Sequence, residues 1–258
     1  MYFPTEIVQT NSQRLLNTAV LIWIPCFFDP RYFLFALPAL LLAFYAQWRV
    51  RSAYERYSRE PNHRGLSGYE AARVLLRSAG LDRIQVEEVP GQLSDHYDPK
   101  KDVLRLSRGV AQSRSVASLG IVAHEVGHAM QDATGYTPLR VRSGLVPAVQ
   151  IGSWLGPIIF FVGFFLSGLT GSTAIAWLGL FLFAGTAVFA LVTLPVEFNA
   201  SKRALQLLSS YQLVDGRELQ QAKAVLDAAA LTYVAALAQA LSTLLYYVFL
   251  LTGFSRRD

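Results

Sequence analysis

Residues 143–196 read SGLVPAVQIGSWLGPIIFFVGFFLSGLTGSTAIAWLGLFLFAGTAVFALVTLPV and contain no charged side chain. The polar stretch Gly168-Leu169-Thr170-Gly171-Ser172-Thr173 interrupts this run near its middle. A helix needs about twenty apolar residues to cross a bilayer. We therefore predict a transmembrane hairpin over residues 148–194, with one span at 150–169 and the next at 173–194.

Two further apolar runs extend the membrane part. Residues 32–48 form one run, which is followed by Arg49. Residues 231–251 lie inside a second long stretch without charge. The whole chain is 53% hydrophobic and 16% charged, with a mean hydropathy of +0.33, which is too apolar for an ordinary soluble domain. The fold class we predict is mainly α, a multi-span α-helical membrane protein with four spans.

The N-terminal segment, residues 1–31, also contains an apolar run, but a shorter one. Its central run, residues 15–28, is too short to cross a bilayer, and no small-residue cleavage site follows it. We expect it to remain in the mature chain as an interfacial or re-entrant piece, on a side that the sequence leaves open. The only cysteine, Cys26, excludes an intrachain disulfide.

Basic residues near the span ends set the expected orientation. Eight of them fall on one side of the four spans: Arg49, Arg51, Arg56, Arg59, Arg140, Arg142, Lys202 and Arg203. By the positive-inside rule this side is cytoplasmic; the tail, residues 252–258, argues the other way with only Arg256 and Arg257. The net charge of +5 then reflects topology and contact with anionic lipid, and we expect no nucleic-acid partner.

The chemistry is indicated by His124-Glu125-Val126-Gly127-His128. Side chains four residues apart share one face of a helix, so both imidazoles can give a ring nitrogen to one Zn²⁺ while the carboxylate acts as general base. Ser115 is placed to cap this helix over residues 116–131, and Gly135 to end it. Since glycine inside a helix costs about 1 kcal/mol relative to alanine, we expect Gly127 to let another helix come close.

A catalytic zinc site normally has three protein ligands, so the two histidines need a partner. His63 and His96 lie in polar loops, and Asp132 shares the straight helix of the histidines, from which a tetrahedron is hard to close. Glu197 directly follows a predicted span, where a carboxylate is expected to be functional or paired. We predict Glu197 as the third ligand, in a segment covering residues 195–230.

Residues 49–147 are predicted to form a small α+β catalytic domain on one side of the membrane. Ser67-Gly68-Tyr69-Glu70 has the spacing of a capping box, as has Asp215-Gly216-Arg217-Glu218 further on, so each should open a helix. Residues 84–89 and 103–106 read as the two strands of a β-hairpin. Such a hairpin either adds substrate peptide as a further strand or only covers the zinc helix.

The transition state of peptide hydrolysis needs a hydrogen-bond donor for the developing oxyanion. His96, Tyr97 and Tyr233 are candidates for this role or for contact with substrate, and spacing does not choose among them.

Three stretches together resemble a known family: HEVGHAMQ at residues 124–131, DHYDP at 95–99 and LPVEFNAS at 194–201. They are similar to the YugP-type neutral zinc metallopeptidases, a family of membrane proteases, over about residues 30–251. The resemblance implies a zincin-like site with ligands His124, His128 and Glu197 and with Glu125 as base. The more distantly similar HtpX and prenyl-protein proteases carry an Asp four residues after the ligand Glu. Ser201 stands there in this chain, so Ser201 and Asn199 are the candidates to orient a ligand.

The resulting prediction is an integral membrane endopeptidase with one zinc ion, acting on peptide or membrane-protein substrates near the membrane surface. We expect it in a bacterial cell membrane with the site facing the cytoplasm. The alternative is a zinc-binding membrane scaffold or regulator without turnover, for which Ser201 in place of Asp leaves room. A metal transporter fits less well because the ligands fall outside the spans. Substrate identity, cleavage preference and oligomeric state are left open.

Overall fold

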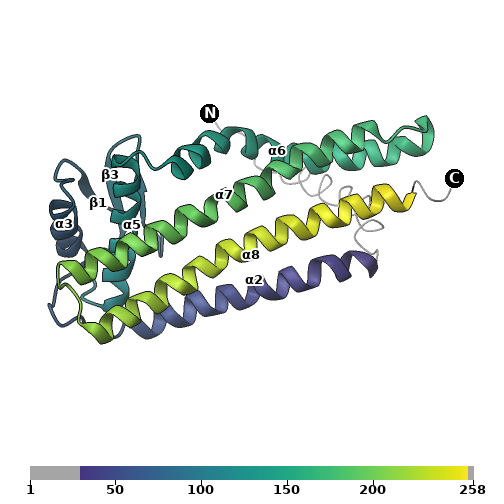
Figure 1. Cartoon of the computed structure of the whole chain (residues 1–258). Coiled ribbons are helices and arrows are strands. Elements are labelled where there is room, and N and C mark those ends of the chain that lie inside the picture. The colour runs from purple at the N-terminus through teal and green to yellow at the C-terminus, as the bar shows by residue number, and fades with distance from the viewer. Residues whose placement is uncertain (1–29, 255–258) are drawn as a thin grey trace, which may run out of the picture.

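Four long helices lie roughly parallel to one another and form most of the molecule (Figure 1). The computed structural model describes residues 30–254, so the predicted N-terminal segment lies almost wholly outside the described residues. The long helices are α2 (Pro30–Tyr57), α6 (Thr137–Thr170), α7 (Ala174–Ser210) and α8 (Gly216–Phe254). Each is long and apolar enough to cross a bilayer.

The long helices pack in the order α6, α7, α8, α2. Helices α6 and α7 are joined by the turn at Gly171, whose φ of 67° suits glycine, as the interrupted apolar run predicts. Helix α7 continues through Pro195 well beyond the predicted end of its span. Helix α8 likewise joins the helix opened by Asp215 to the last predicted span without a break.

A small domain sits at the end of the molecule where α7 ends and α8 begins (Figure 1). It contains α3 (Gly68–Ser78), α4 (Arg108–Gln112), α5 (Val116–Ala133) and a three-stranded sheet. Its hydrophobic core is continuous with the ends of α7 and α8, through residues such as Leu75, Leu104, Val122, Leu208 and Leu226. The domain and the long helices are therefore held together by one core, and the predicted fold class is confirmed.

The predicted helix caps are present. The Ser67 hydroxyl accepts a hydrogen bond from the Glu70 N–H, and the Glu70 carboxylate accepts one from the Ser67 N–H. Asp215 and Glu218 pair in the same way at the start of α8. The Ser115 hydroxyl accepts from the Ser118 N–H at the start of α5.

The predicted β-hairpin is wrong. Strands β1 (Gln85–Val89) and β3 (Val103–Ser107) pair in parallel, with Gln85 opposite Val103. The antiparallel partner of β3 is a strand inside the predicted loop, β2 (His96–Asp98). A tight turn makes this pairing possible, because the Asp98 carboxylate accepts the N–H groups of Lys100 and Lys101. The sheet order is β1-β3-β2, with the buried β3 in the centre and β2 at an edge.

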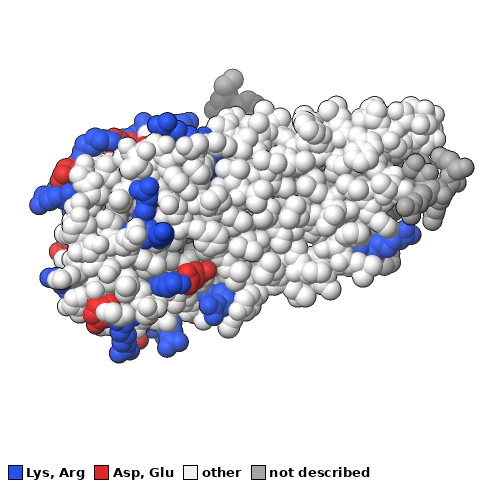
Figure 2. Space-filling view, viewed as in Figure 1, with Lys and Arg blue, Asp and Glu red and all other residues white. Residues whose placement is uncertain are grey.

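Charge is gathered at one end of the molecule. Figure 2 shows Lys, Arg, Asp and Glu over the end that carries the small domain, while most of the remaining visible surface is uncharged. Large apolar side chains are exposed along the long helices, among them Phe44, Trp154 and Phe181. A surface of this kind fits contact with lipid rather than water.

Candidate metal centre

Three predicted ligands converge where α5 meets α7. His124 Nε2 lies 3.2 Å from Glu197 Oε2, and His128 Nε2 lies 3.5 Å from the same oxygen. One ligand atom from each residue lies within 4.8 Å of the other two, an arrangement that the described residues show nowhere else among His, Cys, Asp and Glu. Glu197 is 3% exposed, and the side chain of each histidine is 14% exposed. Two imidazoles and a buried carboxylate aimed at one point are a donor set typical of catalytic zinc.

Gly127 explains how the two helices come so close. A Cβ atom built on Gly127 would lie 2.6 Å from the carbonyl oxygen of Ala200, which is backbone of α7. The expected packing role of Gly127 is therefore confirmed. Because Gly127 precedes His128 and Ala200 follows Glu197 by three residues, this contact sets the separation of the ligands.

Each histidine is oriented through its other ring nitrogen. Ser201 Oγ lies 3.2 Å from His124 Nδ1, and Gln131 Oε1 lies 3.0 Å from His128 Nδ1. An acceptor at Nδ1 fixes the tautomer that leaves Nε2 free to bind a metal. Ser201, one of the two candidates to orient a ligand, therefore contacts His124 directly. Asn199, the other candidate, acts through Gln131, because its side-chain oxygen accepts a hydrogen bond of 3.0 Å from Gln131 Nε2.

Glu125 lies beside the ligands without joining them. It is 9% exposed, and its Oε2 accepts a hydrogen bond of 3.1 Å from the backbone N–H of Tyr97 on β2. Burial raises the pKa of the Glu125 carboxyl above its ordinary value, although the neighbouring histidines oppose the rise. A carboxylate with a raised pKa is better matched to proton transfer near neutral pH.

These side chains face a cavity of about 350 Å³. Its walls come from β2, α5, α7 and α8 and from the first turns of α6, which contribute Leu139, Arg142, Ser143 and Val146. The cavity gives a ligand of peptide size a path to the three converging atoms.

The comparisons with known proteins agree with this site. The family described as "Putative neutral zinc metallopeptidase" matches residues 32–252. The chain belongs to this family. It is also similar to the "Putative membrane protease YugP" of Bacillus subtilis (strain 168), with 42% identity over 212 residues that cover 82% of this chain and 92% of that protein. No solved structure matches the chain.

In this member of the family, the candidate substrate contacts occupy different places. His96 is exposed on β2, with Nδ1 2.9 Å from the Ser94 carbonyl oxygen, at the rim of the 350 Å³ cavity. Tyr233 on α8 lines the same cavity next to Glu197. The Tyr97 hydroxyl donates to Asp102 at 2.8 Å and to Asp132 at 3.2 Å. Because the hydroxyl is engaged with these two carboxylates, the group of Tyr97 that contacts Glu125 is its backbone N–H.

Two residues of the site were missed by the sequence analysis. Gln131 was quoted only as part of a motif, but it is fully buried and links His128 to α7, with Nε2 2.8 Å from the Val196 carbonyl oxygen. Arg142 was counted only as a topology signal, yet its Nη2 lies 3.8 Å from Glu197 Oε1, and it lines the cavity. For Gln131, the one signal in the sequence was its i, i+3 spacing from His128, which places the two side chains on the same helix face.

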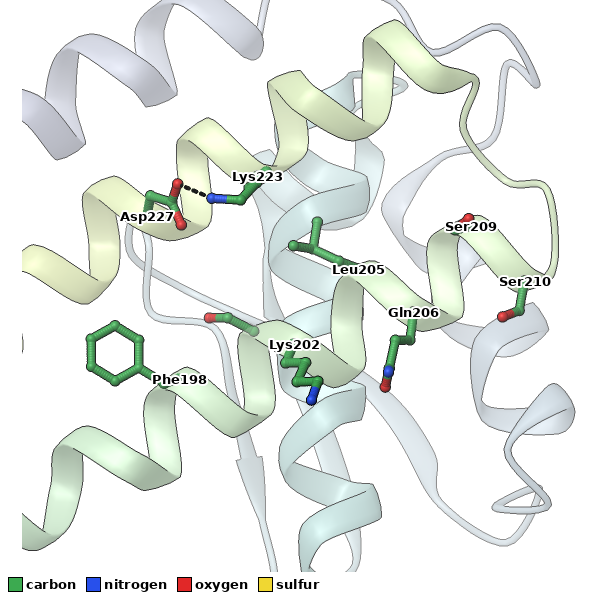
Figure 3. Close-up of a pocket in the computed structure, with 9 residues that line it drawn as sticks. Phe198, Lys202, Leu205, Gln206, Ser209, Ser210, Lys223 and Asp227 are labelled. Carbon is green, nitrogen blue, oxygen red and sulfur yellow. Dashed lines mark hydrogen bonds and ion pairs between the residues drawn. The ribbon is translucent and has the colours of Figure 1, made fainter.

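A wider hollow of about 520 Å³ lies on the outer side of α7 and α8 (Figure 3). It is open to the surface and contains Phe198, Lys202 and an ion pair of 2.5 Å between Lys223 and Asp227. It touches the metal centre only through Ser201 and holds none of the converging ligands. Size alone therefore does not identify the functional cavity here.

Proposed function

We propose that this protein is an integral membrane endopeptidase that uses one zinc ion to hydrolyse peptide bonds near the membrane surface. The observation that carries the proposal is the convergence of His124 Nε2, His128 Nε2 and Glu197 Oε2 beside the buried carboxylate of Glu125. Membership of a family described by zinc peptidase activity supports the choice of metal.

The residues present fit a catalytic zinc ion. Three neutral or anionic donors meet at one point, both histidines have an acceptor on the remote ring nitrogen, and the fourth side faces a cavity. When bound, zinc lowers the pKa of a coordinated water and polarises a carbonyl group.

Glu125 is the residue that moves protons in the proposed reaction. The Tyr97 N–H holds one of its carboxylate oxygens and leaves the other for the attacking water. Glu125 accepts a proton from this water and passes it to the leaving amine when the peptide bond breaks. Burial, which raises the pKa of its carboxyl, makes Glu125 a stronger base for the first half of this transfer.

The position of the site suggests which substrates reach it. Glu197 lies just beyond the uncharged part of α7, and the first turns of α6 form a wall of the cavity. We infer that the enzyme acts on membrane proteins, or on peptides held at the membrane, close to the bilayer surface.

Removal of the metal tests the proposed function. Protein purified in detergent is expected to contain one zinc per chain and to cleave an unfolded protein such as fluorescently labelled casein. A zinc chelator should abolish cleavage, and added Zn²⁺, but not Mg²⁺, should restore it, because Mg²⁺ prefers oxygen ligands in octahedral geometry. Zinc content is measured by atomic emission and cleavage by release of fluorescence.

The scaffold alternative gives a different result in the same experiment. A zinc-binding scaffold would contain the metal yet cleave neither casein nor any of a broad set of membrane proteins. Ser201 stands where the more distantly similar proteases carry an Asp, and its contact with His124 supplies an orienting bond at that position.

We further propose that the site faces the cytoplasm of a bacterial cell. The gathering of charge at the domain end supports this orientation, because Lys and Arg are retained on the cytoplasmic side of membrane proteins.

Cysteine labelling tests the orientation. In a Cys26→Ser background, Ser209→Cys at the domain end should react with a membrane-impermeant maleimide only after lysis. Ser172→Cys in the turn between α6 and α7 is the matched control and should react in intact cells, since both serines are exposed at opposite ends of α7. The reverse pattern would show that the site faces outward.

A further inference from the structure

A second cavity of about 200 Å³ adjoins the metal centre. It shares Asp95, His124, Glu125, Glu197 and Tyr233 with the 350 Å³ cavity. The two cavities therefore adjoin at the ligands and at the base, and together they are called the cleft below.

The two ends of this cleft lie in different directions. The 350 Å³ cavity extends past His128 toward β2 and the start of α6. The 200 Å³ cavity extends past Ile121, one turn earlier on α5, toward residues 225–233 of α8. A peptide lying across the metal centre would place residues on the two sides of its scissile bond in these two cavities.

The ends also differ in chemistry. Apart from the shared residues, the larger cavity is lined by His96, Arg142 and Ser143 among others. The smaller one has a largely aliphatic wall beyond the shared residues and Ser201: Leu93, Ile121, Val225, Leu226, Ala229 and Ala230. Nothing on this wall would pair with a charged side chain, whereas an apolar side chain would lose its contact with water there.

Helix α8 lines the smaller cavity with an apolar face, and its other face carries charged residues. Leu226, Ala229, Ala230 and Tyr233 follow one another at helical spacing and line the cleft. Lys223 and Asp227 point to the outer hollow and pair with each other (Figure 3). Two alanines on the inner face leave the volume that a larger residue would fill.

We propose that this aliphatic cavity, resting on the proposed peptidase function, selects substrates with a medium-sized apolar side chain, such as Leu, Ile or Met, next to the scissile bond. In a hydrophobic pocket a single methylene group changes the specificity constant by roughly 10-fold to 200-fold. The enzyme therefore prefers Leu to Ala at this one substrate position and rejects Asp there, where the carboxyl groups of Asp95, Glu125 and Glu197 already line the cavity.

Filling the cavity tests the proposal. Pairs of peptides that differ only by Leu or Ala beside the cleaved bond are compared by kcat/KM. Ala229→Leu should lower kcat/KM for the Leu peptide by at least about 10-fold and change the Ala peptide much less. Ala236→Leu makes the same change at an exposed position of α8 and should leave the ratio unchanged.

A second variant enlarges the cavity from the other wall. Ile121→Ala on α5 should shift preference from Leu toward Phe, so the proposal can be tested even if Ala229→Leu does not fold. Leu-to-Ala and Leu-to-Phe ratios that stay unchanged in the folded variants would overturn the pocket assignment and leave the peptidase function standing.

Peptide binding separates this inference from the proposed function. In zinc-loaded protein carrying Glu125→Gln, fluorescence anisotropy should show tighter binding of the Leu peptide than of the Ala peptide, and Ala229→Leu should remove this difference. If the unmodified protein cleaves no peptide, the proposed function fails. The ratio of the affinities for the Leu and Ala peptides, measured by anisotropy, then decides alone whether the cavity selects apolar side chains.

Discussion

Glu125→Gln is expected to abolish cleavage and to leave the zinc content at one ion per chain. Glutamine keeps the size of the side chain and can still accept the Tyr97 N–H, but it cannot take a proton from water. Loss of a general base typically lowers the rate by about 10²-fold to 10⁴-fold. The measurement pairs kcat for casein cleavage with zinc content by atomic emission.

A control for this substitution lies on the sheet. Glu88→Gln changes an exposed carboxylate on β1, outside the cleft, and should keep both full activity and full zinc content. Full activity in Glu125→Gln would contradict the assigned role of the base, and loss of zinc in that variant would instead assign Glu125 to the ligands.

The three candidate ligands could be picked out because each leaves a local trace in the sequence. The four-residue step of His124 and His128 requires only a helix, and a single carboxylate at the end of an apolar run is conspicuous at Glu197. The structure brings these three side chains together, although 73 residues separate His124 from Glu197.

The residues around the ligands could not be predicted in the same way. A glutamine such as Gln131 is ordinarily exposed on a helix, and only the docking of α7 makes it a buried link between His128 and Val196. Arg142 depends in the same way on where α6 starts. An arginine before a span is explained equally well by topology, so its sequence context does not reveal the contact with Glu197.

The membrane helices were predictable from uncharged length, but their ends were not. Hydropathy reports where a helix enters lipid, whereas α7 continues past Pro195 to Ser210 because its last turns pack into the core of the small domain. The pairing of the strands was predicted wrongly for another reason. Alternation of apolar residues indicates a strand but not its partner, and the three-residue strand β2 is too short to be recognised by period.

Gly127→Ala is expected to damage both the fold and the metal centre. The added Cβ would meet the Ala200 carbonyl at 2.6 Å, and neither backbone can move without shifting a whole helix. Overpacking of this kind costs typically 1–3 kcal/mol, which should appear as a lower Tm in detergent. Since the shift separates His128 from Glu197, zinc affinity should fall as well, by roughly 10-fold to 100-fold as for disturbed ligand positioning.

Gly144→Ala is the matched control, because it is the same substitution in a helix where nothing lies within 4 Å of the new atom. Alanine is favoured over glycine in a helix by about 1 kcal/mol, so this variant should keep its zinc and be equally or slightly more stable. A lower Tm for Gly127→Ala, together with an equal or higher Tm for Gly144→Ala, distinguishes the close contact at Gly127 from a general effect of placing alanine in a helix. A Gly127→Ala protein that bound zinc as tightly as the parent would show that α5 and α7 can separate without moving the ligands, and the contact with Ala200 would then be packing alone.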